Sequence, residues 1–420
     1  MSFRLIDNRL FRFLVDHWRW LVFGLLLTFT SSFGQTYFIG LYGDVVREGF
    51  GLSHGNYGGL YAIGTLIGAL GLFLFGGAID RIDVRVFVGL VLAVLAGACL
   101  ALSFAASVWA LALAFAGLRF AGQGMCGHAA MTVMARRFGP DRGKAISVAA
   151  LGLTIGEAVL PLLAIALLLA LGWRTSWGLF AILILVVLLP VCIGLPPKGQ
   201  PPPPARSGGA NEAPGAAALK SSNRREVLSD WRFQLLVLPL FCPAFIFTGF
   251  FFHSVYMFAA KGWAPGLLAT GLLVYALAKV ASGLLSGLAV DRFGAARTFH
   301  ISMPLMALAL AVLALSTSPV GGLIFMVLLG VHVGVHMTAV PALWPELYGT
   351  HYLGAIKSMA GTFGVLSSAI APAVYGWAFD GGLTVVDLAW ITMGVALAGW
   401  ILTIIALRGS IAHQPAAGLP

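Results

Sequence analysis

Three charged side chains lie inside long apolar segments of this sequence: Arg119, Glu157 and Lys279. An ionised side chain at the centre of a lipid bilayer costs about 2.5–3.5 kcal/mol on insertion scales. Such a residue is therefore expected to face a cavity or a charged partner. Because two of the three are cations, the charge inside these segments favours an anionic ligand over a cationic one.

Lys279 lies near the middle of its segment and has polar residues along one helical face. Tyr275 stands four residues before it, and Ser282 and Ser286 stand three and seven residues after it. These spacings bring side chains to the same side of a helix. We expect Lys279 and Tyr275 to bind a carboxylate or similar group of a substrate. The alternative is a cation that is buried between helices and satisfied by carbonyl and hydroxyl oxygens.

Arg119 shares a helical face with Gln123, and Glu157 lies in the next apolar segment. Arg119 can bind an anionic substrate or form a structural ion pair with Glu157. In a sharper interpretation, Glu157 carries a proton. Burial and a neighbouring cation act on the proton affinity of a carboxylate in opposite directions, so the balance can change as a cavity opens. Anion binding by Arg119, its ion pair with Glu157 and proton transfer by Glu157 all stay open at this point.

His332 and His336 are four residues apart and stack on one helical face. Two histidines at this spacing can ligate zinc, but a third ligand is missing because Glu346 lies almost three turns away. We therefore expect no metal and no cofactor, and we interpret the pair as substrate or proton contacts or as packing. Gln35 and Tyr61, on polar stripes of the first two segments, are further candidates for substrate binding.

The composition shows that these segments belong in a membrane. Of 420 residues, 60% are hydrophobic and 10% are charged, whereas soluble domains carry roughly 25% charged residues. The runs are long enough to cross a hydrocarbon core about 30 Å thick as helices. We predict an all-α membrane protein with twelve transmembrane helices, at residues 20–44, 55–79, 86–104, 108–135, 144–169, 175–195, 233–259, 266–290, 298–316, 320–345, 353–378 and 386–407.

One charged motif occurs twice. Gly76, Asp80 and Arg81 recur 211 residues later as Gly287, Asp291 and Arg292. The same offset relates three more pairs: Gly51 and Gly262, Gly143 and Gly354, Pro161 and Pro372. A constant offset indicates a duplicated half. We therefore predict two six-helix bundles, residues 1–195 and 233–420, and a Pro-rich cytoplasmic linker at residues 196–232.

The distribution of basic residues predicts the orientation. Twelve crossings place both termini, the linker and the repeated motifs on one side, together with 20 of the 25 Lys and Arg residues. The positive-inside rule makes this side cytoplasmic. We expect a multi-pass protein of the cytoplasmic (inner) membrane with both termini in the cytoplasm. We interpret the net charge of +10 as a feature of a protein that contacts the lipid bilayer and not of one that binds nucleic acid.

The sequence resembles the major facilitator superfamily of transporters. Both copies of Gly-x-x-x-Asp-Arg stand where that family carries its motif, between helices 2 and 3 and between helices 8 and 9, although Asp83 replaces a usual glycine in the first copy. Arg119, with Gly122 and Gly124, resembles the helix-4 motif of the family. The resemblance implies alternating access around a central site, in which Asp80, Arg81, Asp291 and Arg292 serve conformational gating.

We predict a secondary active transporter that moves a small organic anion, is coupled to protons and works as a monomer. Lys279 and Arg119 would hold the anion, and Glu157 or a histidine of helix 10 would carry the proton. The segment Phe50-Gly51-Leu52-Ser53 resembles monocarboxylate and oxalate/formate-type members of the superfamily, which points to an acid substrate.

Two alternatives remain. The first is an exporter of drugs or cationic compounds by proton antiport, against which the net positive central charge argues. The second is a non-transporting membrane receptor built on the same fold. The sequence contains no phosphate-cradling nucleotide loop and no constellation of enzyme residues, which favours transport driven by an ion gradient over an enzyme.

Overall fold

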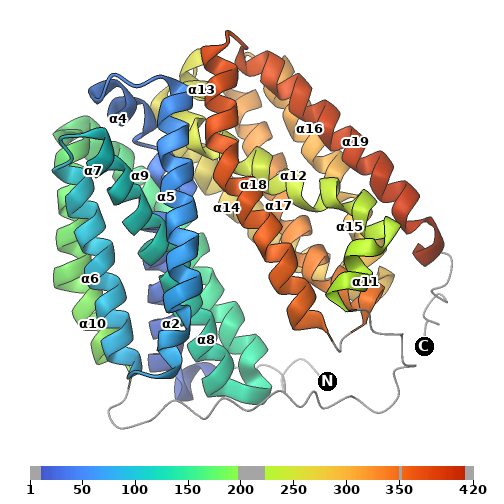
Figure 1. Cartoon of the computed structure of the whole chain (residues 1–420), viewed down its shortest axis with the longest axis horizontal. Coiled ribbons are helices and arrows are strands. Elements are labelled where there is room, and N and C mark those ends of the chain that lie inside the picture. The colour runs from blue at the N-terminus through green and yellow to red at the C-terminus, as the bar shows by residue number, and fades with distance from the viewer. Residues whose placement is uncertain (1–10, 197–222, 350–351, 412–420) are drawn as a thin grey trace. The chain divides into compact units, whose positions relative to one another are not determined.

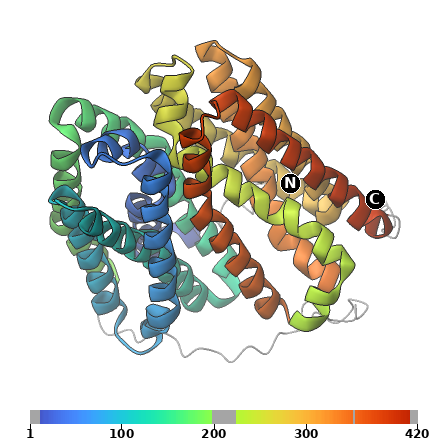
Figure 2. The same ribbon diagram turned by 45° about the horizontal axis from the view of Figure 1, so that its top comes forward.

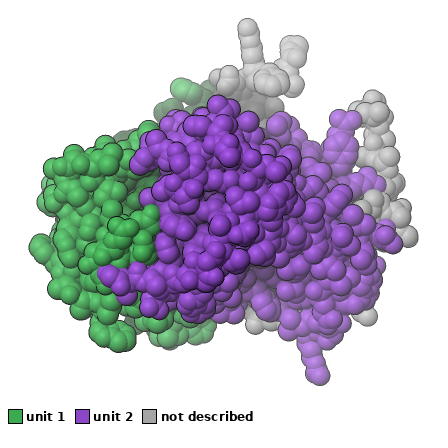
Figure 3. Space-filling view, turned by 90° about the horizontal axis from the view of Figure 1, so that it is seen from above, with its two compact units in different colours: residues 1–50, 60–207 green, residues 51–59, 208–420 purple. Residues whose placement is uncertain are grey.

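The computed structural model describes residues 11–196, 223–349 and 352–411, which form helices and their connecting turns (Figure 1). The chain divides into two compact units. Unit 1 comprises residues 1–50 and 60–207, and unit 2 comprises residues 51–59 and 208–420 (Figure 3). The unit boundary therefore falls inside the second long helix, whose first turn belongs to unit 2.

Unit 1 contains the elements of the first half of the sequence, in this order: α2 (Trp18–Ser31), η1 (Ser32–Gly34), α3 (Thr36–Gly40), α4 (Gly43–Gly49), α5 (His54–Phe75), η2 (Gly76–Asp80), α6 (Val84–Ser103), α7 (Val108–Gly117), η3 (Leu118–Cys126), α8 (Gly127–Phe138), η4 (Gly139–Asp141), α9 (Arg142–Leu183), η5 (Ile184–Leu188) and α10 (Leu189–Gly194).

Unit 2 contains α11 (Arg224–Ser229), α12 (Trp231–Phe252), α13 (Ser254–Ala260), α14 (Pro265–Phe293), α15 (Ala295–His300), α16 (Ser302–Leu315), α17 (Pro319–Tyr348), α18 (Leu353–Asp380) and α19 (Val385–Ile411). Helix α12 packs against α18 and α19, and α16 also packs against α19 (Figure 2).

The helix boundaries repeat at the offset found in the sequence. Four pairs of helices start 211 residues apart: α5 and α14, α6 and α15, α7 and α17, and α9 and α18. The turns repeat as well, because Gly51 has φ +60° and Gly262 has φ +71°. Glycine adopts this left-handed conformation at little steric cost. The duplication therefore extends to the backbone.

Nine continuous helical runs of the described residues are long and apolar enough to cross a membrane. One of them, Val108–Gly194, covers the fourth, fifth and sixth predicted spans. Gly172 (φ +76°) turns the chain between the fifth and the sixth predicted span. The first predicted span is divided into α2, η1 and α3, so it is not among the nine. This arrangement is consistent with the twelve predicted helices.

The predicted linker is partly helical. Residues 197–222 lie outside the described part of the chain, but Arg224–Ser229 forms α11. Its N-terminus carries a capping box, in which Asn223 and Glu226 satisfy each other's backbone N–H groups. Val227 is fully buried in the core of unit 2. A buried valine and a local cap therefore stabilise one helical turn within the predicted linker.

A cation caps the same turn in each half. The Arg174 guanidinium donates to the carbonyl oxygens of Ser103 (3.0 Å) and Ala105 (2.8 Å). The Lys261 ammonium donates to the two carbonyl oxygens that stand 211 residues further on, at 3.1 and 3.0 Å. Carbonyls at helix C-termini lack intrahelical partners and carry negative dipole charge. The need of these carbonyl oxygens for hydrogen-bond donors explains Arg174 and Lys261, two of the three basic residues on the predicted non-cytoplasmic side.

Candidate anion and proton site

The first transmembrane segment is broken near its middle. Helix α2 ends at Ser31, residues Ser32–Gly34 form a 3-10 turn, and Gln35 is extended (φ −79°, ψ 149°) before α3 begins at Thr36. Irregular backbone at membrane depth is tolerated where protein buries it or where it lines a polar cavity. Broken helices of this kind form substrate and ion sites in transporters, because the break frees backbone groups for binding.

The fourth segment is also irregular at the position of its arginine. Residues Leu118–Cys126 form a π-helix between α7 and α8, and π-helical turns frequently occur at functional sites. This stretch crosses the break of the first segment at two glycines. A Cβ atom at Gly34 would overlap the Leu118 carbonyl oxygen and crowd the Cα of Gly122. The two backbones therefore meet directly beside Arg119.

Arg119 binds to the break through neutral acceptors. The side chain is 3% exposed. Its Nη1 donates to the Gly34 carbonyl oxygen at 3.0 Å and to Thr36 Oγ1 at 3.4 Å, and its Nε donates to Thr65 Oγ1 at 3.1 Å. The Arg119 guanidinium also lies 5.2 Å from the centre of the Tyr61 ring. The guanidinium thus holds the break in place.

Among the described residues, no carboxylate forms an ion pair with Arg119. The four ion pairs within 4 Å in the described part of the chain involve other residues. The ion pair with Glu157 that the sequence left open is not formed in this structure. Hydroxyl and carbonyl oxygens solvate a buried cation but do not neutralise it. Unit 1 therefore contains a buried positive centre.

Tyr61 belongs to this cluster and Gln35 stands at its edge. The buried Tyr61 hydroxyl is 2.6 Å from Thr36 Oγ1, so it supports an acceptor of Arg119. Gln35 is half-buried at the break itself. The structure brings Arg119 and Tyr61 together as predicted candidates. Thr36 and Thr65 were not predicted, although a threonine within an apolar run is the signal that could have found them.

Glu157 lies on α9, a helix that packs against the broken first segment. This α9 residue is 6% exposed, and its carboxyl lies within electrostatic range of the Tyr37 hydroxyl. The Ser32 hydroxyl packs closely against α9 at Gly156. A Cβ atom at Gly156 would overlap this hydroxyl. Tyr37 and Ser32 are buried, and their hydroxyls form no hydrogen bond within the described residues. Sequence analysis did not predict these two hydroxyls.

In unit 2, Lys279 and Tyr275 lie together on α14. Lys279 is half-buried, and its Nζ is 5.5 Å from the centre of the Tyr275 ring. Ser282 of the predicted polar face turns to the neighbouring helix α17, where its Oγ donates to the Gly330 carbonyl oxygen at 3.5 Å. The glycines of α17 allow this close approach, because a Cβ atom at Gly334 would overlap Ser282 Oγ. Ser282 therefore serves packing.

His332 and His336 face α16. The Nδ1 of His332 is 2.8 Å from the Ser302 carbonyl oxygen, and the Nδ1 of His336 is 3.1 Å from Ser302 Oγ. Both histidines are buried, and their rings lie 5.5 Å apart. Because their partners come from the interior of unit 2, the contacts favour the packing interpretation of the pair.

The helix ends beside the two repeated motifs are held in different ways. In unit 1, Asp80 forms an ion pair with Arg136 at the end of α8, and Asp83 caps α6 by accepting from Arg85 N at 2.8 Å. Asp83 therefore has its own function where the family motif usually has glycine. Arg81 is exposed at the end of η2.

In unit 2 a carboxylate at the end of α17 caps the helix that follows the motif. The Glu346 side chain, at the end of α17, accepts from Ala295 N at 2.6 Å and from Ala296 N at 3.3 Å, which caps α15. Asp291 and Arg292 are exposed in the last turn of α14. Both motifs thus lie at the joints between helices that the gating hypothesis requires.

This repeated fold and its membrane-embedded polar clusters define the class of the protein, which is that of helical membrane transporters. The sequence matches the Major Facilitator Superfamily over residues 24–372. The chain therefore belongs to this superfamily of membrane transporters. Among curated proteins, no sequence matches the chain.

Solved structures share the fold at low sequence identity. A bacterial homologue of the human lysosomal transporter Spinster, in an inward-facing and occupied conformation, is 18% identical with a TM-score of 0.68; the match covers 93% of this chain and 94% of that one. The nucleoside transporter NupG is 13% identical with a TM-score of 0.66, covering 93% and 99%. At these identities the likeness establishes the fold alone.

Proposed function

We propose that this protein is a secondary active transporter of a small organic anion, coupled to protons, in the cytoplasmic membrane with both termini in the cytoplasm. The observation that carries the proposal is the buried positive charge of Arg119, whose hydrogen-bond acceptors are all neutral. A carboxylate that reaches this centre gains charge-assisted hydrogen bonds in a region of low dielectric. A cationic solute would be repelled there.

Lys279 supplies a second positive charge in the proposal. It is half-buried on α14 beside Tyr275, and these two side chains are the proposed substrate contacts of unit 2. Glu157 is the proposed proton carrier, because it is a buried carboxyl within electrostatic range of the Tyr37 hydroxyl.

Binding by purified protein tests the role of Arg119. Thermal unfolding is measured against a panel of small mono- and dicarboxylic acids. A ligand at 100 times its Kd stabilises the native state by about 2.7 kcal/mol. We expect Arg119→Gln to lose the stabilisation and Arg119→Lys to retain part of it, because lysine keeps the charge but lacks the planar fork.

The matched control is Arg137→Gln, which removes an exposed arginine from the end of the same segment. It should bind the acids as the wild type does. Equal stabilisation of wild type and Arg119→Gln would remove Arg119 from the site. Stabilisation by organic cations and not by acids would favour the exporter.

A further inference from the structure

A pocket lies at the turn between α6 and α7. It has a volume of about 470 Å³, which falls within the range of about 300–1,000 Å³ that is usual for sites of small ligands. Its lining comes from this turn and from α9: Ser103, Phe104, Ala105, Ala106, Arg174 and Thr175. All of these residues belong to unit 1, so one unit forms the pocket by itself.

Arg174 gives the pocket a positive charge. Its Nη1 donates to the carbonyl oxygens of Ser103 and Ala105 at 3.0 and 2.8 Å, and its guanidinium lies 4.2 Å from the centre of the Trp173 ring. A guanidinium has five N–H donors, so those of Nε and Nη2 remain for a ligand. Thr175 adds an exposed hydroxyl. None of the residues that line the pocket is acidic.

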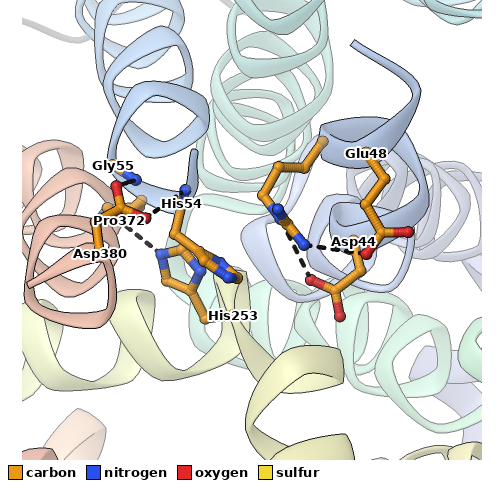
Figure 4. A network of polar contacts seen from close by, with 8 residues as sticks. Asp44, Glu48, His54, Gly55, His253, Pro372 and Asp380 are labelled. Carbon is orange, nitrogen blue, oxygen red and sulfur yellow. Dashed lines mark hydrogen bonds and ion pairs between the residues drawn. The ribbon is translucent and has the colours of Figure 1, made fainter. Parts of the chain in front are cut away.

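A second arginine of unit 1, on the same predicted side of the membrane, is neutralised. Arg47 Nη2 is 3.1 Å from Glu48 Oε1, and Arg47 Nε is 3.8 Å from Asp44 Oδ1 (Figure 4). By contrast, no ion pair within the described residues involves Arg174. An external anion can therefore balance the charge of Arg174, whereas the charge of Arg47 is balanced by the protein.

The corresponding turn of unit 2 is filled by a side chain. Thr317 stands 211 residues after Ala106, and its carbonyl oxygen accepts from Trp263 Nε1 at 3.1 Å. The Trp263 side chain is 3% exposed, so it packs into that turn. In unit 1, no side chain of the described residues donates to the Ala106 carbonyl oxygen, and the pocket lies there instead.

An exposed apolar surface adjoins the pocket. Phe104 is 78% exposed, and Trp109 and Leu113 on α7 are 77% and 71% exposed. Trp109 and Leu113 are four residues apart, so they share one face of α7. Tryptophan is enriched at membrane–water interfaces, where its ring lies at the level of the lipid headgroups. A cationic pocket above an apolar helix face suits a molecule with an anionic head and apolar tails.

We propose that this pocket binds the phosphate of an anionic glycerophospholipid. The Arg174 guanidinium and the Thr175 hydroxyl donate to the phosphate oxygens, and the acyl chains run along the α7 face of Trp109 and Leu113. An anionic lipid is favoured over a zwitterionic one, because the pocket offers no carboxylate to a positive headgroup. In the topology proposed above, the lipid belongs to the non-cytoplasmic leaflet.

Native mass spectrometry of the full-length protein in detergent measures its affinity for phosphatidylglycerol. Arg174→Gln should weaken binding about tenfold, because a hydrogen bond between two charged groups is lost. Ala106→Trp keeps Arg174 and fills the pocket with the kind of side chain that occupies the turn of unit 2, so it should weaken binding as well. This second variant decides the question if Arg174→Gln, which also loses a helix cap, does not fold.

The matched control is Arg142→Gln, which removes an exposed arginine from the first turn of the same helix α9. It should bind phosphatidylglycerol as the wild type does, and phosphatidylcholine should bind the wild type more weakly. A phosphatidylglycerol with a photoreactive group in its acyl chain locates the site. It should label residues 104–113 of the wild type but not of Ala106→Trp.

Glycerol 3-phosphate, which has a phosphate but no acyl chains, distinguishes a lipid from a free phosphate. We expect it not to displace phosphatidylglycerol. Full displacement at equal concentration would assign the pocket to a soluble phosphate compound and overturn the lipid. Equal affinity of the wild type and both pocket variants, or labelling confined to other segments, would overturn the site itself. None of these results bears on anion transport by way of Arg119.

Discussion

At the scale of single residues, the arrangement around Arg119 favours an anion more strongly than its position in the sequence alone. A buried arginine that ends on a carboxylate would be a neutral structural pair. Here the guanidinium donates to one carbonyl oxygen and two hydroxyl oxygens. These neutral acceptors do not neutralise its positive charge, which can therefore attract an anionic ligand. The sequence predicted the cation and its depth, but not its partners, because Gly34, Thr36 and Thr65 come from segments more than 50 residues away.

The residue-scale prediction concerns Glu157. If this carboxyl carries the proton, Glu157→Gln should abolish uptake that is driven by a pH gradient, because glutamine does not exchange a proton, while exchange of labelled for unlabelled substrate continues. Both rates are measured in proteoliposomes. Full pH-driven uptake by the variant would exclude Glu157 as the carrier.

At the scale of elements, the break of the first segment and the π-helix of the fourth form the candidate site. Neither could be predicted from local sequence, since Ser32–Gln35 and Leu118–Cys126 lie in apolar runs that also suit a regular helix. Tertiary contact between the two segments decides the outcome. What the sequence did predict is the position of the helix ends, because turn residues recur at a fixed offset in both halves.

Close backbone approach at the break predicts a strong steric effect. Gly34→Ala places a Cβ atom against the Leu118 carbonyl oxygen, a backbone atom that cannot move aside cheaply. Overpacking of this kind costs about 1–3 kcal/mol, so we expect a lower thermal stability and weaker anion binding. Gly97→Ala is the matched control, because nothing lies within 4 Å of a Cβ atom there. Equal stability of the two variants would mean that the crossing is loose.

The capped turns give a second prediction for elements. Arg174→Met or Lys261→Met leaves two carbonyl oxygens of a helix end without their donor. An unsatisfied polar group costs about 1–3 kcal/mol, and each variant should unfold at a correspondingly lower temperature. Lys144→Met, which breaks a half-exposed pair with Asp141, should cost less than about 1 kcal/mol. Similar melting temperatures for all three would show that the caps contribute no more than a surface ion pair.

At the scale of the whole molecule, the duplicated fold and the family were predictable from composition, the basic-residue bias and one repeated motif. The proposed site residues lie where the halves differ. The buried cation of the fourth helix and the carboxyl of the fifth have no counterpart 211 residues later, where Gly330 and Ser368 stand. The hydrogen bonds from the His54 and Gly55 N–H groups to the Asp380 carboxylate (Figure 4) could not be predicted, because more than 300 positions separate these residues.

The central claim, transport of an organic anion by way of Arg119, is tested most directly by uptake in proteoliposomes. Radiolabelled small carboxylates are offered outside at acidic pH, with a neutral interior, to wild type and to Arg119→Gln. The account predicts accumulation of at least one carboxylate by the wild type and background levels in the variant. Equal accumulation by both proteins, or failure of every carboxylate while an organic cation is transported, would contradict it.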